Sequence, residues 1–562
     1  MKENYQYDAI VIGSGISGGW AAKELSEKGL KTLVLERGRD VQHVRDYPTT
    51  NLEPWELEHR GALTYEELKE NPVVSKCYAF KEDAKHFFAG DKEHPYHQEQ
   101  PFDWIRGYQL GGKSLIWARQ TQRWSNFDFE GPLRDRFAVD WPIRYEDLAP
   151  WYSYVEKFAG ISGNRDGLAT LPDGDFLPPM EMSCVEKHFQ KVVSKKYKDR
   201  HVIIGRCAHI TEAQPVHLQQ GRVNCQYRNL CRRGCLFGGY FSSNAATLPW
   251  ALKTGNLSIR TQSIVESILY DTKTGRSTGV RVIDAVTNAA TEYFARIIFV
   301  NASTLATNQI LLNSKSSRFP QGLGNDNGLL GKYLAFHNYR GKAEATYNGL
   351  LQYTTNGRRP NGAYIPRFRN VHRQETGFLR GYAVALGGWR PLVEPQGWGG
   401  ELRQTLEHPK EAVWKISAGM MGETIPKESN YVSLHADEKD QWGIPLLKIH
   451  VQYDDNDEKM LRDYFEQMKE MFDEAGFSDI TVTDTRQAPG LDIHEMGGVR
   501  MGNDPATSLL NRYNQLHTCK NVFVTDGACM TSTGTQNPSL TYMALTARAC
   551  DYVIRAMKNG SL

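Results

Sequence analysis

A glycine pattern near the N-terminus restricts the fold of this chain more than any other feature. Gly13, Gly15 and Gly18 give the spacing Gly-x-Gly-x-x-Gly between a run that predicts a strand and a run that predicts a helix. A second buried strand is predicted at 31–36, so this segment reads as a βαβ unit. Glycines at this spacing let backbone N–H groups approach a pyrophosphate at the N-terminus of the helix. The pattern therefore predicts an α/β fold that binds a dinucleotide.

An acidic residue lies where this unit needs one. Glu36 ends the second predicted strand, where a carboxylate accepts hydrogen bonds from the ribose hydroxyls and disfavours a 2′-phosphate. A chance match in a glycine-rich chain is the alternative, and the combination of strand, helix and acid argues against it. The fingerprint alone does not distinguish NAD from FAD. Its position at the start of the chain, with an Asp-Gly element far toward the C-terminus, is typical of many FAD proteins.

Composition excludes several classes of partner. The chain has 562 residues, with 67 Lys and Arg against 65 Asp and Glu, and a net charge of +2. A nucleic-acid-binding protein needs a basic excess to neutralise phosphates, so we expect no nucleic-acid partner. No apolar run approaches the roughly 18 residues of a membrane span, so we expect no direct span. The first residues lack the apolar segment of a signal peptide, and we expect no export signal of the chain's own.

The rest of the chain alternates between helical and strand patterns. Helices are predicted at 144–160 and at 456–475, where an apolar face recurs with helical spacing. Strands are predicted at 256–300, with a hairpin turn at 271–275. Short strands at 340–450 predict an antiparallel sheet, and a strand at 521–526 precedes a terminal helix.

Several separated blocks resemble the glucose-methanol-choline (GMC) family of FAD oxidoreductases. They are Arg106–Trp117, Trp141–Tyr152, His494–Gly502, Val524–Ala528 and Gly534–Thr541. The resemblance implies an α/β (α+β) fold, in which a discontinuous Rossmann-like FAD-binding domain of the GMC/p-hydroxybenzoate-hydroxylase type packs against an antiparallel-sheet substrate-binding domain. The predicted FAD domain comprises 1–40, 105–140, 200–325 and 490–562. The predicted substrate domain, with its lid segments, comprises 41–104, 141–199 and 326–489.

The resemblance also implies which residues bind FAD. Besides the first glycine loop and Glu36, a second glycine block would wrap the pyrophosphate and the flavin edge, and a closing block would hold the flavin. The resemblance implies that Asp526 binds the ribityl chain, and a turn aspartate at the end of a strand is the alternative. The cofactor-binding residues expected on this basis are Gly13, Gly15, Gly18, Glu36, Gly111, Gly112, Ser114, Val265, Asp526, Gly527 and Pro538.

The expected chemistry is oxidation of an alcohol. This reaction needs a base that takes the hydroxyl proton while hydride leaves carbon for flavin N5, and a neutral imidazole suits the first task. We predict His494 as the base and Asn537 as the amide that hydrogen-bonds the same hydroxyl. The pair resembles the His–Asn variant of the family. A structural role is the usual reading for one histidine among 16, and the surrounding block reverses it.

Three closely spaced cysteines form a candidate metal site. Cys225, Cys231 and Cys235 have the spacing C-x5-C-x3-C, and a helix would place the last two on one face. Zinc usually takes four ligands, and Cys207 is a distant candidate for the fourth. Buried unliganded cysteines are the other alternative. Family members that pass electrons to a cytochrome carry a cysteine-rich insertion here that holds a three-iron cluster, so the resemblance favours a [3Fe-4S] cluster.

The resemblance is greatest to the catalytic (alpha) subunit of the glucoside 3-dehydrogenases. It implies oxidation of a secondary ring hydroxyl, at C3 of a glucoside or related sugar, with electrons leaving through the cluster to a cytochrome c. It also implies a small export subunit and a periplasmic location, with the cytoplasm as the alternative. A GMC oxidase that uses oxygen and a catalytically silent flavin-binding subunit with a metal knot remain as alternatives.

Aromatic residues between 330 and 450 suit a sugar, whose CH faces stack on rings. A glycine-flanked segment, 387–400, is a candidate lid. For any single aromatic residue, packing against a sheet is the more common role. The residues in question are Tyr333, His337, Tyr382, Trp389, Trp398, Trp414 and Trp442.

Overall fold

A parallel sheet carries the N-terminal glycine loop. The structure is a computed structural model that describes residues 5–354, 359–395, 397–408 and 410–562. Strands β5 (Leu257–Arg260), β2 (Thr32–Leu35), β1 (Tyr7–Ile12), β8 (Ala290–Val300) and β19 (Val522–Val524) lie side by side and run parallel. β2 and most of β1 are buried, as expected of parallel strands that are covered on both faces. The predicted βαβ unit is therefore present.

Helices from both ends of the chain cover this sheet. α1 (Ile16–Glu27) packs against the terminal helix α12 (Ser539–Lys558) and against α8 (Thr247–Leu252), and α12 packs against α5 (Tyr145–Ala159).

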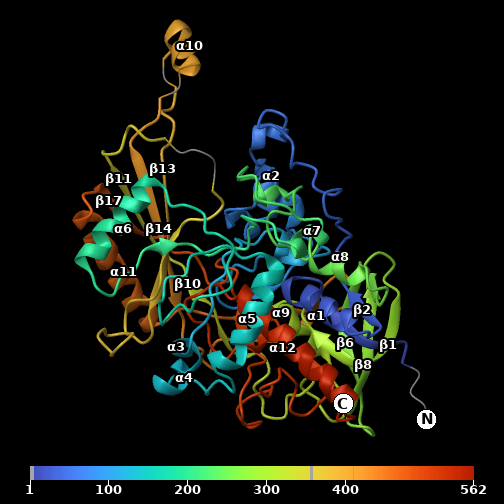
Figure 1. Ribbon diagram of the computed structural model, residues 1–562. Helices are drawn as coiled ribbons and strands as arrows, with labels where there is room; N and C mark the ends of the chain where they lie inside the picture. The colour runs from blue at the N-terminus through green and yellow to red at the C-terminus, as the bar shows by residue number, and fades with distance from the viewer. Residues whose placement is uncertain (1–4, 355–358, 396, 409) are drawn as a thin grey trace.

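 The four helices therefore form one layer over the sheet, drawn as blue, teal, green and red ribbons in Figure 1. The predicted helix at 144–160 is confirmed.

An antiparallel ribbon extends the parallel sheet. β6 (Ser263–Asp271) pairs with β7 (Arg276–Asp284), and β7 pairs with β8. The predicted hairpin turn is confirmed: Lys273 N–H donates to Asp271 Oδ1 at 3.0 Å, and Gly275 has the left-handed φ of 69° that such a turn needs.

A second sheet lies beside the first and is antiparallel. Its order is β17 (Ser478–Asp484), β11 (Gly341–Tyr347), β14 (Trp414–Glu423), β13 (Tyr382–Trp389), β12 (Ala363–Ile365) and β4 (Ile203–Ile204), with β10 (His337–Asn338) paired to the end of β14. α6 (Cys184–Lys196) and α11 (Asp455–Glu474) cover one face. The helix predicted at 456–475 is confirmed, and its apolar side chains enter the core of this sheet.

A third sheet connects these regions. Its order is β18 (Met496–Gly498), β9 (Lys332–Ala335), β15 (Tyr431–Lys439), β16 (Pro445–His450) and β3 (His97–Gln98). The strands at 340–450 therefore do not form the single sheet that was predicted, because β15 and β16 pair outside it. β4 also lies in a segment predicted for the FAD domain, yet it pairs with β12 of the second sheet.

Shorter elements complete the chain. They are α2 (Tyr65–Glu70), α3 (Asn126–Phe129), α4 (Gly131–Arg134), α7 (Pro215–Gln219), α9 (Thr304–Asn313) and α10 (Gly399–Glu407), with 3-10 turns at Glu58–Gly61, Val74–Lys76, Lys85–Phe87, Gly112–Leu115, Cys231–Arg233 and Gly527–Cys529. Across the described part of the chain, no helix has both the length and the apolar character that crossing a membrane requires.

Candidate active site

Two glycine loops meet at the end of the parallel sheet. Gly13 has a left-handed φ of 91°, and a Cβ on Gly18 would lie 1.9 Å from the Gly13 carbonyl oxygen. The first loop therefore needs glycine at both positions. A Cβ on Gly15 would meet no atom within 4 Å, so this residue borders open space. Gly15 is also the N-cap of α1 and offers no side-chain cap, which leaves the helix N-terminus available to an anion.

The second loop packs on the first through hydrogen bonds. Gly111 N–H donates to Ser14 Oγ at 2.9 Å, and a Cβ on Gly111 would collide with the Asn244 side chain. Ser114 Oγ donates to the Gly111 carbonyl at 2.6 Å and accepts from Ser243 N–H at 3.0 Å. Ser114 thus braces the loop through both contacts.

Two buried carboxylates flank the loops. Glu36 accepts from Gly38 N–H at 2.9 Å and from Ser14 N–H at 3.1 Å, and Ser14 Oγ donates to it as well. A carboxylate has about four acceptor positions, so one remains for a ribose hydroxyl. Asp526 accepts from Thr307 Oγ1 at 2.6 Å, and burial raises the pKa of Asp526 to about 6.

A cavity of about 310 Å³ joins these groups. Gly18 and Gly111 do not border it, because they support the loops from behind. The remaining expected cofactor residues do border it, although they come from segments far apart in the sequence. These are Gly13, Gly15, Glu36, Gly112, Ser114, Val265, Asp526, Gly527 and Pro538.

His494 and Asn537 lie together at one end of this cavity. Asn537 Nδ2 is 3.3 Å from His494 Nε2, and both side chains border the cavity. On its other side, His494 Nδ1 is 2.9 Å from His337 Nδ1. His337 Nε2 is in turn 3.2 Å from the Gly534 carbonyl oxygen. The sequence had suggested His337 only as one of several aromatic residues near a sugar.

This chain of contacts fixes the position of each proton. A carbonyl oxygen only accepts, so His337 Nε2 carries a hydrogen and donates it to Gly534. Burial lowers the pKa of His337 to about 4, so its ring is neutral and its Nδ1 accepts. His494 Nδ1 must therefore donate to His337. Burial, with smaller contributions from His337 and Lys113, lowers the pKa of His494 well below its ordinary value. Its Nε2 is therefore an unprotonated acceptor facing the cavity.

The Asp492 side chain holds the backbone of His337 in place. Its Oδ2 accepts from His337 N–H at 2.9 Å, whereas its Oδ1 has no partner among the described residues. Burial raises the pKa of Asp492 to about 7.

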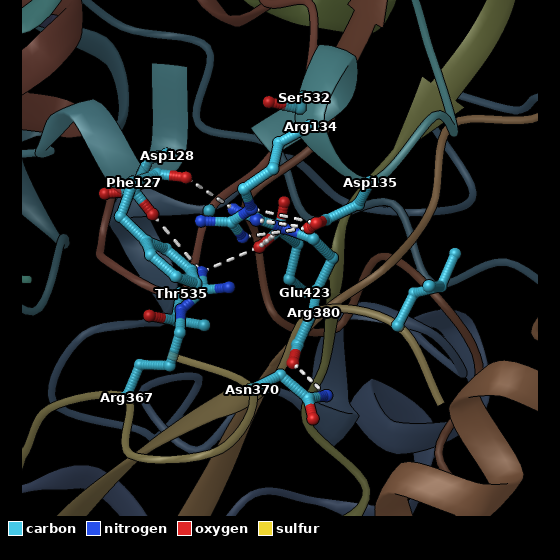
Figure 2. A network of polar contacts seen from close by, with 12 residues as sticks. Phe127, Asp128, Arg134, Asp135, Arg367, Asn370, Arg380, Glu423, Ser532 and Thr535 are labelled. Carbon is cyan, nitrogen blue, oxygen red and sulfur yellow. Dashed lines mark hydrogen bonds and ion pairs between the residues drawn. The ribbon is translucent and has the colours of Figure 1, made fainter. Parts of the chain in front are cut away.

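A buried network of charges holds the strand that carries His337 (Figure 2). Glu423 lies opposite His337 in the ladder between β10 and β14. Its carboxylate accepts from Arg367 Nη2 at 2.7 Å and from Arg380 Nε at 3.0 Å. All three charged side chains of this group are buried, so each needs its partner.

The same network reaches the loop that carries Asn537. Arg367 Nη2 also donates to Asp128 at 3.2 Å, and Gln536 Nε2 donates to the other oxygen of Asp128 at 3.0 Å. Because Gln536 precedes Asn537, the network couples the positions of the base and the amide. No sequence signal pointed to it, since its members come from separate segments.

Comparison with known proteins agrees with this geometry. The GMC oxidoreductase family models match residues 7–338 and 426–546, which together cover more than half of the chain. The chain belongs to the GMC oxidoreductase family. It is 28% identical to 2-methyl-1,2-propanediol dehydrogenase of Mycolicibacterium austroafricanum, over 98% of this chain and 95% of that protein. It is 24% identical to the fructose dehydrogenase large subunit of Gluconobacter japonicus, over 100% of both chains.

A solved structure shows the same fold. Pyridoxine 4-oxidase from Mesorbium loti superposes with a TM-score of 0.61 at 16% identity, over 97% of this chain and 98% of that chain. The GMC assignment confirms the expected fold class.

FAD, the cofactor of GMC oxidoreductases, fits the cavity. The two glycine loops and the uncapped N-terminus of α1 suit a pyrophosphate, and Glu36 retains one acceptor position for a ribose. Several buried polar atoms along the cavity have no partner among the described residues, namely Asn301 Nδ2, Glu495 Oε1 and the Tyr542 hydroxyl. Such atoms are costly unless a ligand satisfies them.

The cysteine segment differs from the expected helix. Only Cys231–Arg233 forms a 3-10 turn, and Gly234 follows with a left-handed φ of 87°, so Cys231 and Cys235 do not share a helix face. No group of three described side chains that includes these cysteines has all its ligand atoms within 4.8 Å, which argues against a single zinc ion. The Sγ atom of Cys207 lies 3.4 Å from the Oγ atom of Ser162. His209 Nε2, which the sequence gave no reason to select, lies 3.6 Å from Cys231 Sγ.

Two buried cations beside the cysteines have no counter-charge. Arg119 and Arg222 form no ion pair among the described residues, and Arg119 Nε and Arg222 Nη2 have no hydrogen-bond partner. Burial lowers the pKa of Arg222 to about 9, and Cys235 opposes this effect. Cys231 raises the pKa of Arg119. The surroundings of the three cysteines therefore suit an anionic group.

The other aromatic residues expected near a sugar lie elsewhere. Tyr382 and Trp414 are buried in the core of the second sheet, and Trp398 is 91% exposed. Tyr333, Trp389 and Trp442 do not border the cavity either. The candidate lid at 387–400, of which residue 396 lies outside the described residues, joins β13 to α10 on a projection at the top of Figure 1, and none of its described residues borders the cavity. Tyr78 and Tyr339 border the cavity instead.

Proposed function

We propose that this GMC oxidoreductase is the catalytic subunit of an FAD-dependent sugar dehydrogenase. It oxidises a secondary ring hydroxyl, at C3 of a glucoside or related sugar, to a ketone. The observation that carries the proposal is the unprotonated Nε2 of His494, held beside Asn537 at the end of the FAD cavity. The relatives support oxidation of alcohol groups, since one is named for a diol and one for a sugar.

The side chains supply the acid–base part of the reaction. His494 Nε2 accepts the hydroxyl proton as the carbon–hydrogen bond breaks and the C=O bond forms. Asn537 lies 3.3 Å from His494 Nε2, so its amide N–H can hydrogen-bond the substrate oxygen as negative charge develops on it. His337 keeps its hydrogen bond to His494 Nδ1 and so stabilises the imidazolium that results. Bound FAD supplies the acceptor for the hydride at N5.

For the route by which electrons leave, we favour a [3Fe-4S] cluster. Cys225, Cys231 and Cys235 would hold it, and it would supply one-electron transfer toward a haem protein. The uncompensated charges of Arg119 and Arg222 support an anionic group at this position. The proposed partners are a cytochrome c and a small export subunit that carries the chain to the periplasm. The name of one relative, a large subunit, supports a smaller partner.

Metal analysis with electron paramagnetic resonance tests the proposal. About three irons per chain are expected, and the Cys231→Ser variant should lose them while Cys184→Ser, in α6, keeps them. One zinc or no metal would exclude the cluster. Anaerobic mixing with a panel of sugars should bleach the flavin. The same reaction in air should produce no hydrogen peroxide. Peroxide production would identify an oxidase, and the absence of bleaching with any alcohol would identify a silent subunit.

A further inference from the structure

A second cavity opens from the catalytic end of the first. It has a volume of about 340 Å³ and lies on the face of the second sheet that α6 and α11 leave uncovered. Gln120, Tyr339, Met421 and Asn537 border both cavities. A ligand that reaches Asn537 can therefore continue along the sheet without leaving the protein.

Small side chains form the floor of this second cavity. Along β14, Ile416 and Ala418 point into the core, whereas Ser417 and Gly419 lie on the opposite face and are only partly buried. A Cβ on Gly419 would lie 3.5 Å from the Tyr339 hydroxyl oxygen, so the ring of Tyr339 stands directly beside this floor. This floor therefore carries no bulky side chain at Ser417 or Gly419, and Tyr339 borders it.

Two opposite charges border the same floor. Lys342 and Glu344 of β11 lie opposite Gly419 and Ser417 in the ladder, and both side chains are exposed. Neither forms an ion pair or a side-chain hydrogen bond among the described residues. Together they offer a donor and an acceptor without a net charge, which suits a neutral ligand rich in hydroxyls. An apolar substituent would gain little from such a border.

We propose that this cavity is a subsite for a second hydroxylated ring, joined by a glycosidic bond to the sugar that is oxidised. The proposal rests on the proposed function, because it assumes that a sugar ring occupies the catalytic end. It makes the preferred substrate a neutral glycoside of two rings. The first ring lies at His494 and Asn537, and the second lies between Tyr339 and the pair Lys342 and Glu344.

Binding measurements separate this subsite from the catalytic step. The probes are methyl α-D-glucopyranoside, which has one ring, and trehalose, which has two and no reducing end. Calorimetric titration of the FAD-loaded His494→Ala variant measures binding without turnover. Adding Ser417→Trp to this variant should weaken the binding of trehalose by about tenfold or more. It should weaken the binding of methyl glucoside by less than about twofold. Ser417→Ala, which leaves the cavity open, should change neither.

A second variant protects the test against misfolding. Lys342→Ala with Glu344→Ala changes two exposed side chains and should also weaken trehalose selectively. Equal effects on both probes, or no effect, would overturn the subsite even if both sugars bleach the flavin of the unmodified enzyme. Selective weakening of trehalose supports the subsite even if no sugar bleaches the flavin, and in that case the proposed function fails instead.

Discussion

Substitution of His337 tests the hydrogen-bond chain that sets the tautomer of His494. The Oδ1 atom of an asparagine takes about the position of Nδ1 in a histidine. The Nε2 atom of a glutamine takes about the position of Nε2 in a histidine. His337→Asn therefore keeps an acceptor for His494 Nδ1–H, which is 2.9 Å away. His337→Gln keeps the contact to the Gly534 carbonyl but loses that acceptor. The two variants thus separate the effect on the tautomer from the effect on packing.

The expected magnitude follows from the cost of an unsatisfied buried donor. Without an acceptor at residue 337, the His494 tautomer with hydrogen on Nδ1 is disfavoured by about 1–3 kcal/mol. Only this tautomer presents a free lone pair at Nε2. The rate of flavin reduction should therefore fall by the factor that corresponds to this free energy, about 5-fold to 150-fold. The rate of flavin reduction should fall much less in His337→Asn than in His337→Gln.

Anaerobic stopped-flow mixing with substrate measures this rate directly from the flavin absorbance. Flavin content and circular dichroism of each variant serve as controls for cofactor binding and folding. Flavin reduction at the unmodified rate in His337→Gln, or equal slowing in His337→Asn and His337→Gln, would show that His337 does not set the tautomer of His494.

Three further predictions concern pH, stability and cofactor binding. Because burial holds the pKa of His494 well below its ordinary value, the base stays unprotonated as pH falls, and the reduction rate should be constant from about pH 8 to about pH 6.5; a midpoint near 6.5 would contradict this. Glu423→Gln leaves two buried arginines without their shared carboxylate and should lower the free energy of unfolding by about 3–5 kcal/mol in urea titration; a loss below about 1 kcal/mol would show that the network adds little. Gly15→Val places a side chain in the open space before α1, so flavin retention on gel filtration should fall, while the unfolding midpoint of the flavin-free protein should stay the same.

Local patterns predicted the elements of this fold whose stability is local. The glycine turn at Gly13, the hairpin at 271–275 and the amphipathic helix α11 each follow from spacing that the sequence displays. Sheet membership is different, because strand pairing depends on which segments meet in space. The sequence grouped β15 and β16 with their neighbours along the chain, whereas β15 pairs with β9 and β16 with β3. β4 joins a sheet whose other strands begin more than 100 residues later.

The residues of the site also fall into two groups, those that a local sequence pattern predicted and those that depend on contacts in space. His494 and Asn537 were predictable because each lies in a block with a family pattern. The role of His337 was not, because it arises from a contact between two rings that are 157 residues apart. Spacing also misled at the cysteines, since a helical arrangement of Cys231 and Cys235 requires a helix that Gly234 interrupts.

Arg119 connects the two parts of the site and strengthens the case for a charged group at the cysteines. It borders the FAD cavity, and a thiolate at Cys231 is close enough to raise its pKa. A buried guanidinium without a carboxylate is unfavourable, because desolvation is not offset by an ion pair. Neutral thiols offset it poorly, and burial raises the pKa of the Cys225 thiol to about 11, so the cysteines alone stay neutral. The proposed cluster would be held by thiolates, and their negative charge would lie beside Arg119.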